Sequence, residues 1–324
     1  MRFPMMFLLY DILHKSRRRP LPRCHSGIYP VRSRKTGHSP TLGRRGFLRT
    51  VAFVSLFHPL ITLISDARGS TKRNRSQTLA RGDPYKNARG VLVSEGFDKQ
   101  YVDDLFSDPR MKLYPAIKKV LNRPSESLTY KKYRRVMAVE QKIRDGRIFS
   151  RTYADELEEA EKKYRVDGHY IAAIIGAESD YGRNPGKYNP VGVFVTMIER
   201  IAQRRSFGEV ELVELVHFCQ RYDIDPHSLR SSYSGAIGIA QFIPSLLNKL
   251  FVDADGDGTP DPTKVVDAIH SIANYLKNHR GYGSGWSPGT KALPGNKNWR
   301  ALLAYNNHPN YARAVSEIAE GILQ

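Results

Sequence analysis

The chain has 324 residues and a formal net charge of +19, which is distributed very unevenly. Residues 1–90 hold 19 Lys and Arg against 3 Asp and Glu, whereas residues 91–324 hold 32 against 29. No recognition helix, zinc-ligand spacing or basic–aromatic sheet motif accompanies the charge, so nucleic-acid binding is not expected. With only Cys24 and Cys219, a disulfide-rich framework is excluded. Because no nucleic-acid-binding motif accompanies its charge, the basic segment 1–90 is expected to be a targeting and linker region.

The N-terminal segment has the features of an export signal. Residues 43–49 read Gly-Arg-Arg-Gly-Phe-Leu-Arg, which resembles the twin-arginine signal of bacteria. A mostly apolar run follows over residues 51–64, and Ser-Asp-Ala at 65–67 has the small-x-small pattern of a cleavage site. We therefore expect residues 1–67 to be a cleaved signal and the protein to be periplasmic, with an uncleaved inner-membrane anchor as the alternative. Residues 68–90 are polar and basic and predict a flexible linker.

From residue 91 onward, the sequence predicts a mainly α protein. An N-terminal helical subdomain is expected over residues 91–165 and a second, larger unit over residues 166–324. The patterns predict helices over 96–106, 114–121, 129–143, 153–164, 166–182, 196–204, 209–222, 266–279 and 312–322.

The helix over residues 166–182 is the most informative. Asp167 is a suitable N-cap and Gly182 a natural stop. Three isoleucines and Glu178 fall at i, i+3, i+4 and i+7, so one stripe combines apolar residues with a carboxylate. Burial and the negative end of the helix dipole should raise the pKa of Glu178, as a general acid for glycosidic cleavage requires. The alternative is a Glu that bends into solvent or pairs with an Arg.

A second stretch, residues 231–244, places small residues and two glycines around a single glutamine, Gln241. It predicts either a tight turn in the core, in which Gln241 bonds the backbone, or a groove wall that offers Ser232 and Gln241 to a sugar. The residue pattern leaves both open.

Tyrosines gather in the C-terminal part of the chain. Tyr275 lies beside the apolar stripe of its helix, so we expect it to be half-buried with an exposed hydroxyl. Tyr305, Asn306 and Tyr311 suit a sugar groove, because rings stack on sugars and amides bond hydroxyl and acetamido groups. Tyrosines are also ordinary helix-packing residues, and that alternative stays open.

Residues 253–261 match the first nine positions of an EF-hand calcium loop. Position 12 departs from the pattern, because Lys264 stands where a bidentate Glu is usual. A loop extended to position 15 would close on Asp267, and the alternative is a turn that binds no ion. Calcium (Ca²⁺) here would stabilise the loop, and no cofactor is expected for chemistry. The expected ligands are Asp253, Asp255, Asp257, Thr259 through its backbone, Asp261 and Asp267.

Together these motifs resemble the membrane-bound lytic murein transglycosylase B family, lysozyme-like enzymes that cleave bacterial peptidoglycan. The likeness runs from about residue 94 to residue 322. It implies a lysozyme-like catalytic core over residues 166–324, with Glu178 as the catalytic residue and Ser232 hydrogen-bonded to it. It also supports Asp267 as the closing calcium ligand. The groove residues that it implies are Ser232, Gln241, Tyr275, Tyr305, Asn306 and Tyr311.

The resemblance implies non-hydrolytic cleavage of the β-1,4 bond between N-acetylmuramic acid and N-acetylglucosamine, giving a 1,6-anhydro product. Glu178 would act as acid and then as base. An ordinary glycosidase needs a second carboxylate, and Asp180, two residues further on, falls on the other side of the helix. The alternatives are a lysozyme-type hydrolase and a non-catalytic wall-binding protein. Expected partners are peptidoglycan strands and cell-wall synthesis or division proteins, with the chain itself a monomer.

Overall fold

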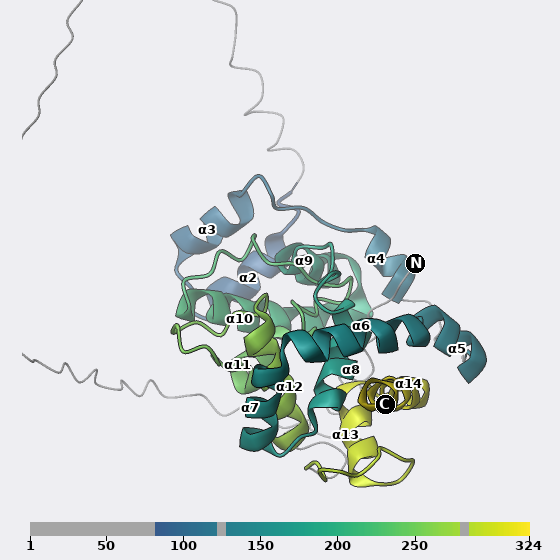
Figure 1. The fold of residues 1–324 in the computed structure, drawn as a ribbon. Helices are drawn as coiled ribbons and strands as arrows, with labels where there is room; N and C mark the ends of the chain where they lie inside the picture. The colour runs from purple at the N-terminus through teal and green to yellow at the C-terminus, as the bar shows by residue number, and fades with distance from the viewer. Residues whose placement is uncertain (1–81, 122–127, 279–284) are drawn as a thin grey trace, which may run out of the picture. The chain divides into compact units, whose positions relative to one another are not determined.

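The computed structural model describes residues 82–121, 128–278 and 285–324, which are helical with only isolated β-bridges (Figure 1). The prediction of a mainly α protein is confirmed for these ranges, and none of their helices is long and apolar enough to cross a membrane. The expected export signal lies outside them. The helices are α2 (Lys86–Ser94), α3 (Lys99–Ser107), α4 (Ala116–Leu121), α5 (Tyr130–Met137), α6 (Val139–Thr152), α7 (Ala154–Tyr164), α8 (Gly168–Ser179), α9 (Pro190–Arg200), η2 (Ala202–Arg204), α10 (Arg205–Arg221), α11 (Pro244–Leu250), α12 (Val265–Asn278), α13 (Lys297–Tyr305) and α14 (Pro309–Leu323).

Helix α8 lies at the centre of its neighbours and packs against α6, α7, α12 and α14 (Figure 1). Residues 170–176 are all buried, so the expectation of a single apolar stripe is wrong. The reason is that Ala172, Ala173 and Gly176 are small enough for helices to approach on the faces that an amphipathic helix would expose to water. This burial on all sides is what surrounds Glu178 with protein.

The two ends of α8 differ from expectation in detail. Asp167 takes the N-cap position, but its carboxylate accepts hydrogen bonds from the Trp286 indole (2.7 Å) and the Gly289 amide (2.8 Å) instead of capping the helix. At the other end, Asp180, Tyr181 and Gly182 all have positive φ, at 57°, 59° and 81°. The helix therefore ends before the glycine, at Ser179.

Two other boundaries are corrected. Helix α2 begins at Lys86, inside the expected linker, because Ala88 and Leu92 form a buried stripe and α2 packs on α9 and α10. The helix expected over 129–143 is interrupted at Ala138, which has a φ of 52°. Helices α6 and α7, from the expected N-terminal subdomain, pack directly on α8. The boundary between residues 165 and 166 stays a prediction.

The segment 231–242 forms a tight folded wall next to the central helices. Isolated bridges pair Ser231 with Tyr188, Ser231 with Ile237, and Ile237 with Phe242. The amide of Ile239 donates to the carbonyl of Pro262 at 2.9 Å, which ties this wall to the loop 253–267. The wall and the aspartate loop are therefore one connected structure.

Candidate active site

Glu178 lies in the last turn of α8, with only 4% of its surface exposed. Its Oε1 accepts a hydrogen bond from the hydroxyl of Tyr311, on α14, at 2.7 Å. Burial raises the pKa of Glu178 to about 7, against smaller lowering effects of the Tyr311 hydrogen bond and the Lys142 charge. Among the described residues, Glu178 has no arginine partner, and Oε2 accepts no hydrogen bond. The carboxyl group is therefore neutral up to near-neutral pH and has one oxygen available.

This pKa makes stability depend on pH. Glu178 titrates near 4.5 when unfolded and near 7 when folded, so folding favours its neutral form. That contribution is complete below pH 4.5 and is lost as the pH rises through 7. Glu178→Gln, which stays neutral, should match the wild type at about pH 4 and be more stable by about 3 kcal/mol at about pH 9. Denaturant unfolding at both pH values tests this, and equal stability at the higher pH would contradict it.

Tyr275 and Tyr305 pack against each other with ring centroids 4.8 Å apart, and both are buried. The Tyr305 hydroxyl donates to the carbonyl of Ala240 at 2.5 Å, and the Tyr275 hydroxyl donates to that of Ala304 at 2.6 Å. The expectation of a half-buried Tyr275 with an exposed hydroxyl is therefore wrong, because the hydroxyl satisfies a backbone carbonyl inside the core. The two rings therefore pack under the wall and are bonded to it through the carbonyl of Ala240.

Gln241 and Asn306 each keep a buried polar atom without a hydrogen-bond partner among the described residues. The Gln241 Nε2 donates to the carbonyls of Pro185 (3.0 Å) and Gly238 (2.8 Å), which fixes the amide orientation and leaves Oε1 unpaired. Asn306 is 2% exposed, and its Nδ2 is unpaired. A buried acceptor and a buried donor without partners are costly in a folded protein, so they indicate a ligand or ordered water. Gln241 bonds the backbone, as the tight-turn alternative expected, and the groove wall that offers Ser232 and Gln241 to a sugar stays a prediction.

Ser232 does not bond Glu178 in this structure. Its hydroxyl exchanges a hydrogen bond with that of Ser234 (2.8 Å) and accepts one from the Ala236 amide (3.2 Å). The serine partner that the resemblance implied for Glu178 is replaced here by Tyr311, because the tight turn after Ser232 engages its hydroxyl locally.

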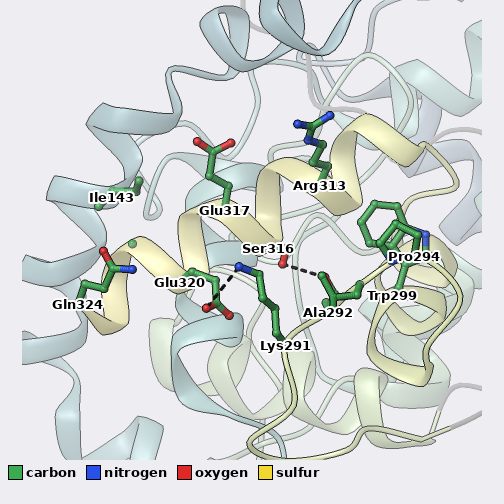
Figure 2. A pocket seen from close by; sticks show the side chains of 12 residues that line it. Ile143, Lys291, Ala292, Pro294, Trp299, Arg313, Ser316, Glu317, Glu320 and Gln324 are labelled. Carbon is green, nitrogen blue, oxygen red and sulfur yellow. Dashed lines mark hydrogen bonds and ion pairs between the residues drawn. The ribbon is translucent and has the colours of Figure 1, made fainter.

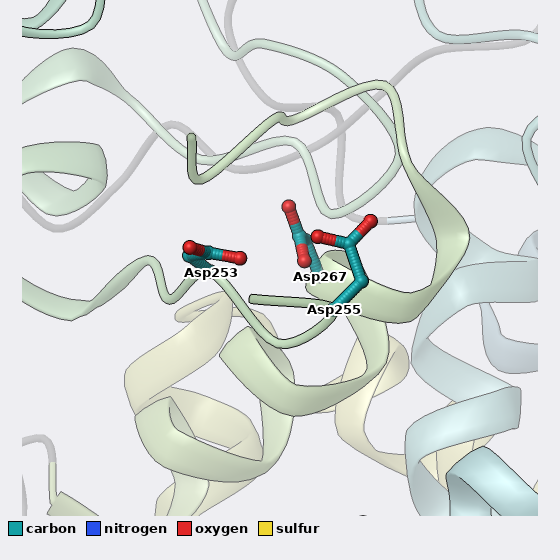
Figure 3. A group of neighbouring side chains, drawn as sticks. All are labelled: Asp253, Asp255 and Asp267. Atoms are coloured by element: carbon teal, nitrogen blue, oxygen red, sulfur yellow. The ribbon is translucent and has the colours of Figure 1, made fainter. Parts of the chain in front are cut away.

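The aspartate loop brings three of the expected carboxylates together. Carboxylate oxygens of Asp253, Asp255 and Asp267 lie within 4.8 Å of one another (Figure 3). Three hard oxygen donors at this separation fit a calcium ion. The side chains of Asp257 and Asp261 are not part of this group, and Asp257 bonds the Lys264 ammonium. The backbone ligand expected from Thr259 stays a prediction.

The family model described as Transglycosylase SLT domain matches residues 83–294, more than half of the chain. The chain belongs to the transglycosylase SLT domain family. Membrane-bound lytic murein transglycosylase B of Escherichia coli (strain K12) is 29% identical over 209 residues, which cover 61% of this chain and 56% of that protein. The match therefore spans little more than half the length of this relative.

Two solved structures share the fold of this SLT-domain chain. SltB3 from Pseudomonas aeruginosa, in complex with NAG-anhNAM-pentapeptide, has 25% identity and a TM-score of 0.67, covering 75% of this chain and 80% of that chain. Slt35 of Escherichia coli, in complex with calcium, has 24% identity and a TM-score of 0.67, covering 76% and 94%. The predicted lysozyme-like helical fold of the family is thereby confirmed.

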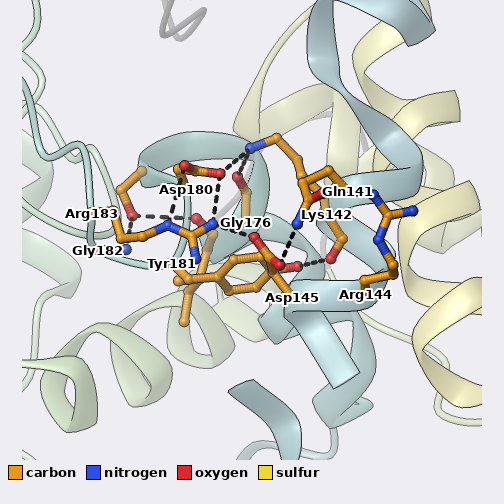
Figure 4. A network of polar contacts seen from close by, with 11 residues as sticks. Gln141, Lys142, Arg144, Asp145, Gly176, Asp180, Tyr181, Gly182 and Arg183 are labelled. Atoms are coloured by element: carbon orange, nitrogen blue, oxygen red, sulfur yellow. Dashed lines mark hydrogen bonds and ion pairs between the residues drawn. The ribbon is translucent and has the colours of Figure 1, made fainter. Parts of the chain in front are cut away.

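A buried lysine supports the helix that carries Glu178 and was missed in the sequence. Lys142 is 6% exposed, and its ammonium donates to the Gly176 carbonyl (2.5 Å) and pairs with Asp180 (3.1 Å). Asp180 also forms an ion pair with Arg183, with a separation of 3.2 Å. Figure 4 shows these side chains together. Lys142 occupies the buried face of α6, so a lysine on an apolar stripe was the signal available.

The SLT-domain chain has a pocket of about 570 Å³ beside α14 (Figure 2). None of the expected catalytic or groove residues lines it. Three of its charged residues form ion pairs, Lys291 with Glu320 at 3.7 Å and Glu317 with Arg134 at 2.6 Å, and a fourth, Arg313, lies over the ring of Tyr130. The buried carboxyl group of Glu178, with its raised pKa, therefore lies outside this pocket.

Proposed function

We propose that the protein is a peptidoglycan lytic transglycosylase in which Glu178 is the catalytic residue. The observation that carries the proposal is a buried carboxyl group with a pKa of about 7 and one unbonded oxygen. Membership in the SLT-domain family supports it. The charged or polar side chains that shift this pKa are Tyr311 and Lys142, and no carboxylate is among them. Asp180, the nearest carboxylate in sequence, is engaged in ion pairs with Lys142 and Arg183.

One carboxyl group is sufficient for the proposed reaction. Neutral Glu178 protonates the glycosidic oxygen between N-acetylmuramic acid and N-acetylglucosamine, and the bond from C1 to that oxygen breaks. The substrate's acetamido group shares the positive charge at C1. The Glu178 carboxylate then removes the proton from the C6 hydroxyl of the muramic residue, whose oxygen forms a bond to C1. The product is a 1,6-anhydro sugar, no water is consumed, and Glu178 is again neutral. A pKa near the working pH suits both steps.

The wall residues have a proposed role in binding the sugar. The unpaired Oε1 of Gln241 accepts from an acetamido N–H, and the unpaired Nδ2 of Asn306 donates to an acetamido or hydroxyl oxygen. The remaining groove residues, Ser232, Tyr275, Tyr305 and Tyr311, shape the groove or hold Glu178. The substrate class is supported by the peptidoglycan fragment bound to SltB3.

Digestion of purified peptidoglycan by the full chain, with products read by mass spectrometry, tests this function. Anhydromuramic products are expected. Products one water heavier would indicate the lysozyme-type hydrolase and a second carboxylate. Binding to the wall without any product would indicate the non-catalytic wall-binding protein.

Tyr311→Phe is expected to change the pH dependence of cleavage. The Tyr311 hydrogen bond lowers the pKa of Glu178, so its loss raises that pKa further. The first step needs neutral Glu178, and kcat/KM falls as the pH rises through this pKa. We expect the descending limb to move up by about one pH unit. A pH–rate profile measures the shift, and a variant with lower activity but an unmoved limb would contradict the role of the hydroxyl.

We also propose that the aspartate loop takes a structural calcium ion on Asp253, Asp255 and Asp267. The convergence of their carboxylates supports this. The ion would stabilise the loop and, through Pro262 and Ile239, the groove wall. Isothermal calorimetry tests the site, and the absence of calcium binding to the folded protein would refute it.

The proposals for the cellular location and the domain division of the chain rest on its sequence. We propose export to the periplasm by the twin-arginine-like signal, with inner-membrane anchoring as the alternative, and a division into residues 91–165 and 166–324. Peptidoglycan strands are the proposed partner, and association with cell-wall synthesis or division proteins stays a prediction. N-terminal sequencing of the exported protein tests the signal, and a start upstream of Thr50 would remove it.

A further inference from the structure

Lys264 forms ion pairs at the centre of the aspartate loop. Its Nζ lies 2.7 Å from Asp255 Oδ2 and also bonds Asp257 Oδ2. In the EF-hand pattern these are positions 3 and 5, which ordinarily face the ion. Lys264 itself stands at position 12, where that pattern has a ligand. Position 12 therefore has a cationic side chain where the pattern has an acidic ligand, and this side chain bonds two of the expected ligands.

The backbone of the loop is already held in a closed form. Asp253 accepts hydrogen bonds from the amides of Gly256 (2.7 Å) and Gly258 (2.8 Å). Asp267 accepts from the amides of Ala254 and Asp261, each at 2.8 Å. These bonds bring the negative charges of several aspartates together, so the closed form needs positive charge nearby. Lys264 supplies positive charge from within the loop.

We infer that the Lys264 ammonium is a built-in cation that holds the loop closed without calcium and competes with calcium for Asp255 and Asp257. The competition rests on the calcium site proposed above, whereas loop closure by Lys264 does not. An incoming ion must displace the ammonium from Asp255, which belongs both to the three-carboxylate group and to the ion pair. The groove wall, bonded to Pro262, then keeps its support at low calcium.

Amide hydrogen exchange, measured on the full chain with calcium removed by a chelator, tests whether Lys264 holds the aspartate loop closed. In Lys264→Gln, the amides of Gly256, Gly258 and Asp261 should exchange about tenfold faster than in the wild type, while α8 is unchanged. Lys264→Arg keeps the positive charge, so its loop amides should exchange as slowly as those of the wild type. Lys277→Gln is the matched control, since Lys277 lies exposed in the last turn of α12, the helix that begins directly after Lys264, and has no ion pair among the described residues. Equal exchange in Lys264→Gln and the wild type would overturn the proposal.

Calcium titration by calorimetry tests the competition. Lys264→Gln should bind calcium about tenfold more tightly than the wild type, because no ammonium has to be displaced. Equal affinities would overturn the competition. If neither protein binds calcium while Lys264→Gln still exchanges faster in chelator, closure by Lys264 is supported, and the calcium site of the proposed function is what fails.

Discussion

Glu178→Gln is expected to lower the rate of peptidoglycan cleavage by about a thousandfold, because proton transfer by a positioned side chain contributes about 10²- to 10⁴-fold. The amide has nearly the same shape as the neutral carboxyl group and can still accept from the Tyr311 hydroxyl. It cannot donate and then recover a proton, so both proposed steps lose their catalyst. Release of soluble fragments from labelled peptidoglycan measures the loss.

Glu211→Gln is the matched control for this variant. Glu211 is 1% exposed, and its pKa is also raised to about 7, mainly by burial. Its carboxylate accepts from the amide (2.9 Å) and hydroxyl (2.8 Å) of Ser245, at the start of α11, and among the described residues it has no hydrogen bond to the candidate site. Cleavage should survive in Glu211→Gln. Equal losses in the two variants would mean that neutralising a buried carboxylate is harmful in general and that Glu178 has no special role.

Gly238→Ala is expected to lower the free energy of unfolding by about 3 kcal/mol or more and to abolish cleavage. Gly238 has a φ of +72°, which disfavours any side chain, and an added Cβ would lie 2.1 Å from the Pro262 carbonyl oxygen. Either the wall or the aspartate loop must move. The bond from the Ile239 amide to Pro262 and the bond from Gln241 to the Gly238 carbonyl would be disturbed together.

Gly289→Ala separates the cost of a side chain at positive φ from the cost of the close contact with Pro262. Gly289 has a similar φ of +66°, but no atom lies within 4 Å of an added Cβ. It should cost only about 1 kcal/mol, for backbone strain alone, and leave cleavage unchanged. Denaturant unfolding and fragment release measure both variants. Similar stability losses in Gly238→Ala and Gly289→Ala would show that the contact between wall and loop is not tightly packed.

The sequence predicted the central helix and its carboxylate because both depend on local patterns. Capping and stop residues bound α8 to within a few positions, and an acid in an apolar helix was sufficient to predict a raised pKa for Glu178. Spacing along the loop also predicted that Asp267 lies near Asp253 and Asp255, as their carboxylates do. The interruption at Ala138, which has a φ of 52°, could not be predicted, because no glycine or proline marks it in the sequence.

Contacts between distant segments account for the remaining differences. Tyr275 is fully buried because a carbonyl 29 residues away accepts its hydroxyl. The Lys142 side chain reaches α8 from α6, and no spacing within one helix indicates that pairing. Lys264 could be recognised as a departure from the calcium-loop pattern, but its bonds to two aspartates depend on the folded shape of the loop. Local patterns therefore predicted the candidate carboxyl group and the aspartate loop, whereas the contacts that hold them in place became visible only in the structure.

Digestion of peptidoglycan by the full chain in ¹⁸O-labelled water tests the central claim most directly. If the C6 hydroxyl of the muramic residue attacks C1, the anhydro product contains only substrate oxygens, and mass spectrometry should detect no ¹⁸O in it. Incorporation of one ¹⁸O at the new reducing end would mean that water attacks C1, which would contradict the single-carboxylate transglycosylase mechanism.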